Sequence, residues 1–127
     1  MKRQRLLAAH VLILALPLQP ALAAPRGLTE AEHTGLRCAA AIAMGAGAQT
    51  RGEGWAKAYP ALAPRGREFF VRLAAQLMDQ AGLDEAGVQA AAQAEAAALR
   101  RSGGAGTVMP FCLRLLDAQP GLSKPAP

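Results

Sequence analysis

The order of apolar and polar residues along the chain predicts four helices and no strand. In four segments apolar residues recur every three or four positions, which is the spacing of one helix face at about 100° per residue. β-branched residues are few, and no segment alternates between apolar and polar residues as a half-buried strand does. We therefore expect an all-α protein with helices at about 30–49, 64–81, 85–101 and 108–118.

Capping residues mark the expected helix ends. Thr29 and Glu32 form a capping-box pattern before the first helix. Pro64 suits the first turn of the second helix. Further caps are expected at Gly82, Asp84 and Thr107. The Gly- and Pro-rich segment 50–63 is expected to be a loop, and Gly103 to Gly106 a flexible joint.

The four predicted helices differ in their apolar faces. The first has a face of small residues that lets a partner helix approach closely: Ala31, Gly35, Cys38, Ala39, Ile42 and Ala46. The second is apolar over more than half of its circumference, which is typical of the central helix of a bundle. The third is almost all alanine, so its helicity rests on intrinsic propensity. We expect a small domain resembling a four-helix bundle.

The first 23 residues have the layout of a cleaved signal peptide. Lys2, Arg3 and Arg5 precede an apolar run at 6–18, and Ala21-Leu22-Ala23 is a small-x-small cleavage site. The run is shorter than the roughly 20 residues that span a bilayer, so we expect no stable membrane span after cleavage. The mature chain is then expected to start at Ala24, with a helical domain at 24–118 and a disordered, Pro-rich tail at 119–127.

Removal of this leader changes how the net charge is interpreted. The formal charge of +5 includes three basic residues of the leader, and without it 11 basic residues face 9 acidic ones. The remaining charges are interspersed and form no basic stripe, so nucleic acid is not an expected partner. The composition, rich in Ala, Gly and Arg, is typical of a high-GC bacterium, and we expect a periplasmic or secreted protein.

Cys38 and Cys112 are expected to form a structural disulfide. An even number of cysteines in an exported protein favours such a bond, and both residues fall on apolar helix faces. The closed loop of about 75 residues corresponds to roughly 4 kcal/mol in the chain-entropy model. A redox dithiol favours a Cys-x-x-Cys spacing, and two thiols without histidine neighbours do not complete a zinc site.

No set of residues predicts catalysis, a metal site or a cofactor. After cleavage His33 is the remaining histidine, and we expect it to be solvated on the polar face of the first helix. Ser102 lies in the glycine-rich joint, and Glu95 is isolated among alanines. The joint lacks the lysine and the preceding strand of a phosphate-binding loop. We therefore expect a protein that is not an enzyme.

Aromatic and arginine residues mark the candidate binding surface. Four of the five aromatic residues lie within sixteen positions of one another. The surface that we predict consists of Trp55, Tyr59, Phe70, Arg65 and Arg67. Trp55 and Tyr59 are expected to lie against the helix 64–81 near Phe70, either as a lid on the core or as an apolar interface. Arg65 and Arg67, near a helix N-terminus, are either solvated or able to bind an anion.

The leading hypothesis is a small exported, non-enzymatic protein-binding or envelope-maintenance factor whose partner is another envelope or secreted protein. One alternative is a carrier for a lipid or other apolar ligand. Another is a periplasmic inhibitor or immunity protein. The overall plan of a leader, about 100 helical residues and two distant cysteines is also similar to small periplasmic acid-stress chaperones. The sequence carries no signal for the oligomeric state.

Overall fold

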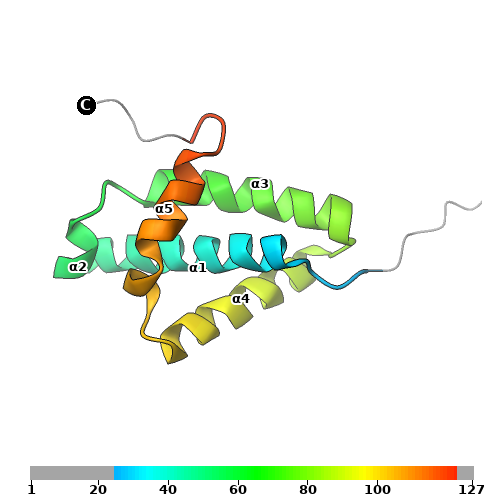
Figure 1. Ribbon diagram of the computed structural model, residues 1–127, viewed down its shortest axis with the longest axis horizontal. Coiled ribbons are helices and arrows are strands. Elements are labelled where there is room, and N and C mark those ends of the chain that lie inside the picture. The colour runs from blue at the N-terminus through cyan, green and yellow to red at the C-terminus, as the bar shows by residue number, and fades with distance from the viewer. Residues whose placement is uncertain (1–24, 123–127) are drawn as a thin grey trace, which may run out of the picture.

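The computed structural model describes residues 25–122, which form an all-helical structure (Figure 1). Its elements in chain order are α1 (Glu30–Thr50), α2 (Gly54–Lys57), α3 (Ala63–Ala81), α4 (Glu85–Arg101), the 3-10 helix η1 (Ala105–Thr107) and α5 (Met109–Asp117). The described residues contain no strand, so the predicted all-α class is confirmed. The four predicted helices form within one residue of their expected bounds, whereas α2 and η1 were not predicted. The predicted leader lies outside the described residues.

The helix ends show which local predictions hold. The capping box is present, because Glu32 N donates to Thr29 Oγ1 at 3.2 Å and Thr29 N donates to Glu32 Oε2 at 2.8 Å. Gly82 ends α3 with a φ of 70°, in the left-handed region that glycine adopts without strain. Asp84 caps α4 by accepting from Gly87 N at 2.8 Å. Thr107 is not the cap of α5; it lies in η1.

The central helix is α1, and the expectation that the second predicted helix is central is wrong. α1 packs against every other element and is buried on several sides. α3 buries a single stripe of four residues, Phe69, Leu73, Leu77 and Ala81. Its remaining apolar residues include Val71 and Met78, whose side chains are exposed. The apolar excess of α3 is therefore partly surface, and the small residues of α1 supply the common packing face.

Two glycines show how tightly α1 is packed. A Cβ atom on Gly66 of α3 would lie 2.5 Å from Ile42 Cγ2 of α1. A Cβ atom on Gly45 of α1 would lie 2.7 Å from both Leu62 Cδ1 and Met109 Cε. Such distances are well inside van der Waals contact, so a larger residue at either position would require its neighbours to shift.

The helices do not close around α1. α3 and α4 meet at the turn 82–84 and spread apart toward the end of the molecule where α2 lies, with α1 between them (Figure 1). α5 has nine residues and crosses α1 on the side that carries Cys38. A regular four-helix bundle is thus not confirmed. Within residues 25–122, no helix is both long enough and apolar enough to span a bilayer.

The pairing of Cys38 with Cys112 is confirmed. Their sulfur atoms lie at disulfide-bond distance and their Cα atoms are 5.0 Å apart. Both side chains are buried in the core, among residues of α1, α3 and α5. The bond joins the central helix to the last helix across 74 positions of sequence.

The ordered fold continues past residue 118, where the predicted domain ends. Leu122 is 4% exposed and belongs to the core. Arg65 Nε donates to Leu122 O at 2.8 Å, and Arg72 Nη1 donates to Pro120 O at 2.6 Å. Residues 119–122 are therefore not a disordered tail, and the rest of the predicted tail, 123–127, lies outside the described residues. One apolar side chain anchors the turn, and two guanidinium groups satisfy its carbonyl oxygens.

A buried carboxylate ties the start of the described chain to α1 and α3. Glu32 is 5% exposed and accepts from Arg26 Nη1 at 2.8 Å and from Arg26 Nη2 at 2.7 Å. Arg26 N also donates to Ala81 O at 3.1 Å. The hydrogen bonds from Arg26, and then from the backbone of Thr29, lower the pKa of Glu32 to about 2.

Removal of the disulfide should cost much of the stability of the domain. We expect Cys38→Ala combined with Cys112→Ala to lower the free energy of unfolding by about 4 kcal/mol, because the unfolded chain loses a closed loop of this length. Urea denaturation followed by circular dichroism measures the change, and reduced wild-type protein is the control. An unchanged denaturation midpoint in both would refute this structural role.

The Arg26–Glu32 pair should make stability depend on acid pH. The pKa of Glu32 is lower in the folded chain than the ordinary value of 4.5, so its stabilisation is present above that value and is lost as pH falls toward 2. Glu32→Gln should therefore be less stable than wild type near neutral pH, with a gap that closes between about pH 4.5 and 2. Thermal melting across this range tests the expectation. Glu30→Gln, an exposed carboxylate in the same turn, is the matched control.

Candidate functional site

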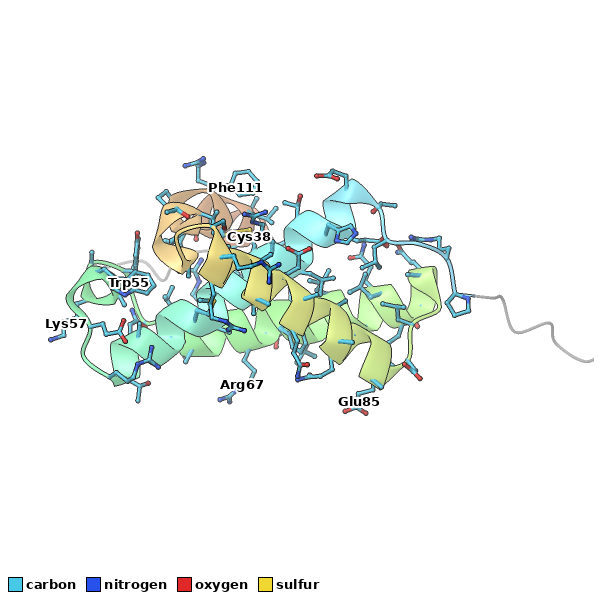
Figure 2. The ribbon with its side chains drawn as sticks, turned by 90° about the horizontal axis from the view of Figure 1, so that it is seen from below. Cys38, Trp55, Lys57, Arg67, Glu85 and Phe111 are labelled. Carbon is cyan, nitrogen blue, oxygen red and sulfur yellow. A yellow bond between two sulfur atoms is a disulfide. The ribbon has the colours of Figure 1, made fainter. Side chains whose placement is uncertain are left out.

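A cavity of about 780 Å³ opens between the C-terminal half of α1, α2 and the segment 100–107. We call it the aromatic cleft, because Trp55 and Tyr59 line it. Their ring centroids are 6.5 Å apart, and the rings meet edge to face. Trp55 is 40% exposed, although it is one of the largest apolar side chains of the protein. Figure 2 shows Trp55 at the α2 end of the molecule.

Polar contacts hold the Trp55 indole in place. Its Nε1 donates to Glu53 Oε2 at 2.9 Å, and Arg51 Nε donates to Glu53 Oε1 at 2.7 Å. These two hydrogen bonds keep the pKa of Glu53 below its usual range, and the bond from Arg51 has the larger effect. The indole packs on the glycine-rich segment. A Cβ atom on Gly106 would lie 3.4 Å from Trp55 Cε3.

The amide of Gln49, in the last turn of α1, positions the segment that carries these aromatic residues. Gln49 Nε2 lies within hydrogen-bond distance of three carbonyl oxygens, at 3.1 Å from Ala56 O and 3.0 Å from both Tyr59 O and Pro60 O. Its Oε1 accepts from Leu62 N at 3.0 Å. Sequence reasoning missed this residue, because a glutamine at a helix end has the same pattern when it faces solvent.

A second cavity, of about 570 Å³, lies between α3 and α4 with α1 as its floor. We call it the alanine groove. Its floor consists of Ala39, Ala40, Ala43, Met44 and Ala46. Phe70 and Gly66 form the α3 wall, and Ala92 and Ala96 the α4 wall. At 100° per residue, Ala40 and Ala43 lie roughly opposite Cys38 around α1, so the groove is on the side that α5 leaves uncovered.

The two cavities adjoin along the C-terminal half of α1. Both are lined by Ala43 and Met44. We refer to the aromatic cleft and the alanine groove together as the α1 trough. The trough contains three of the five aromatic residues of the chain. It is open to solvent, and Ala43 in its floor is exposed although α1 is the central helix.

The structure brings four of the five predicted surface residues to the trough, but not in the expected arrangement. Trp55 and Tyr59 line the aromatic cleft, whereas Phe70 and Arg67 line the alanine groove. Trp55 lies close to Gly106, and Gln49 holds the backbone of Tyr59 at the last turn of α1.

Arg65, the fifth predicted residue, belongs to a structural contact instead. Its side chain is 12% exposed and pairs with Asp117, and its Nε donates to Leu122 O. Arg65 therefore joins α3 to the C-terminal turn. The two candidate arginines of the α3 N-terminus point to different parts of the molecule, and only Arg67 remains at the trough.

The edge of the trough is positively charged. Arg67 from α3, Arg100 from α4 and Arg51 line its two cavities. Among the described residues that line the trough, Glu53 is the one carboxylate, and it is already engaged by Arg51 and Trp55. The other polar side chains of the alanine groove are Gln89 and Gln93, which carry no charge.

His33 and Glu95 are outside the trough. His33 Nδ1 lies 3.0 Å from Glu95 Oε1, so Glu95 is not isolated as the sequence suggested, and the pair links α1 to α4. The imidazole remains about half exposed. Across residues 25–122, no group of three or more His, Cys, Asp or Glu side chains is placed to hold a metal ion. The side chains that line the trough are suited to binding.

Loss of the Gln49 amide should release the aromatic segment. Gln49→Leu leaves Leu62 N and the carbonyl oxygens of the segment 56–60 without their partner, which should lower the free energy of unfolding by roughly 1–3 kcal/mol. Trp55 is the single tryptophan of the chain, so its emission reports directly on the cleft. We expect a shift to longer wavelength as the indole becomes hydrated. Unchanged emission together with unchanged stability would contradict the positioning role of Gln49.

The α1 trough is therefore the candidate functional site, with an apolar floor, three aromatic side chains and arginines at its edge. Comparison of the chain with family models, with curated proteins and with solved structures finds no match. The function is accordingly inferred from the chemistry of the trough itself.

Proposed function

We propose that this is an exported, non-catalytic binding protein that holds an apolar segment of another envelope or secreted protein in the α1 trough. The observation that carries the proposal is Trp55, 40% exposed beside an apolar groove that no described element covers. Tryptophan, tyrosine and arginine are the residues that most often dominate the binding energy of protein interfaces. All three types line the trough.

The shape of the alanine groove supports a helical segment as the occupant. α3 and α4 diverge on either side of α1, and alanines form much of the floor and the α4 wall between them. Small side chains let an additional helix approach closely, since interaxial distance depends on the side chains at the contact. An amphipathic helix that places its apolar face in such a groove is a common mode of recognition.

A carrier for a lipid is less well supported by this geometry. Small-molecule sites bury about 70–90% of the ligand surface in a cleft or cavity. Both cavities of the trough instead lie open along the side of α1, as an extended groove. An extended, open surface suits a segment of a larger partner that itself covers the exposed edge.

Two observations support export. The first 23 residues have the charged start, apolar run and cleavage site of a signal peptide. The Cys38–Cys112 pair is at disulfide distance in the core, and such bonds persist in oxidising compartments. Together they favour the periplasm or the exterior as the place of action.

Site-specific photo-crosslinking in the producing cell tests the proposal. A benzoylphenylalanine at Gln93, on the edge of the alanine groove, should give a discrete crosslinked product with a second protein. The same group at Ala94, the next position of α4, is exposed but does not line either cavity and is the matched control. Trp55→Ala should reduce the Gln93 product. Equal labelling at both positions, or none at Gln93, would count against the trough as the binding site.

A further inference from the structure

We infer that the segment held in the α1 trough is an amphipathic helix with carboxylates beside its apolar stripe. This inference rests on the proposed function and adds the charge of the partner to it. The charge of the partner is inferred from the side chains at the edge of the trough and from their ion pairs within the described chain.

Two arginines at the edge of the trough have no acidic partner within the described chain. Arg67 stands on the α3 side of the groove, and Arg100 lines the cleft from the end of α4. Both side chains are exposed, and neither forms an ion pair within residues 25–122. Figure 2 shows Arg67 projecting from the body of the protein. Both guanidinium groups are therefore available to an anionic partner.

No carboxylate on the trough opposes this charge. Glu53 is the acidic residue that lines it, and hydrogen bonds from Arg51 and Trp55 occupy its two oxygens. Gln89 and Gln93 are neutral. A helix with Asp or Glu at its polar edge meets opposite charge here, whereas a helix with Lys or Arg meets like charge. Such complementarity selects partners more than it adds affinity.

The same charge pattern argues against the leader of this chain as the occupant. Residues 1–23 contain an apolar run, but their charged side chains are Lys2, Arg3 and Arg5, with no Asp or Glu. The leader would bring like charge to Arg67 and Arg100. An acidic amphipathic helix from another protein matches both the apolar floor and the basic edge.

A pair of labelled helical peptides tests the inference with the full mature protein. Both peptides carry the same stripe of Ala and Leu, and their polar face is Glu in one and Lys in the other. Fluorescence anisotropy at low ionic strength should give about tenfold tighter binding of the Glu peptide, because two exposed ion pairs become repulsive in the Lys peptide. This preference should weaken as salt is added.

Charge variants then locate the effect. Arg67→Gln with Arg100→Gln should bring the two affinities within about twofold of each other, as expected for the loss of both surface pairs. Arg101→Gln with Arg114→Gln removes the same net charge from exposed residues that do not line the trough, and should keep the preference. A preference that survives in the first variant, or disappears in the second, would overturn the inference.

Other outcomes also decide against it. Equal affinity for both peptides, or no binding of either, overturns the acidic helix. A lipid that co-purifies in the trough by native mass spectrometry, or a Gln93 crosslink between two copies of this chain, does the same. A Gln93 crosslink to another protein without any charge preference leaves the proposed function intact and refutes this inference alone. Absence of the Gln93 crosslink refutes the proposed function whatever the peptides do.

Discussion

The close approach of neighbouring helices to α1 is the constraint on which the rest of the structure depends. Gly66 lies so near Ile42, and Gly45 so near Leu62 and Met109, that a single added carbon atom would collide. α1 can contact every other element because most of its buried residues are glycine, alanine or cysteine. Small side chains bury little apolar area each, so contacts between distant parts of the chain contribute to holding the domain together.

Those contacts connect α1 and α3 to the start and to the C-terminal part of the described chain. The Cys38–Cys112 pair connects α1 to α5 in the core. Arg26 and Glu32 attach the start of the described chain to α1, while Arg65 holds the turn that ends in Leu122. Each contact satisfies a buried charge or carbonyl group or closes a long loop, and each therefore restricts the chain where helix packing alone is weak.

The small residues that permit this packing also leave the candidate site. α3 and α4 spread away from α1, and the alanines between them do not fill the space that opens. The short α5 covers the opposite side of α1. The uncovered floor, the half-exposed Trp55 and the arginines at the edge thus arise from one cause, a central helix with small side chains and too few partners to surround it.

The sequence by itself determined the helical class, the bounds of four helices within one residue, the capping box and the cysteine pairing. Periodicity, capping and cysteine usage can be read from neighbouring residues or from simple counts. It also pointed to four residues that line the trough. Only the tertiary structure decided that α1 is central, that Gln49 positions Trp55, that Arg65 turns to the C-terminal turn and that Leu122 belongs to the core. Each of these depends on a partner many positions away, and a side chain that finds such a partner has the same local pattern as one that remains in water.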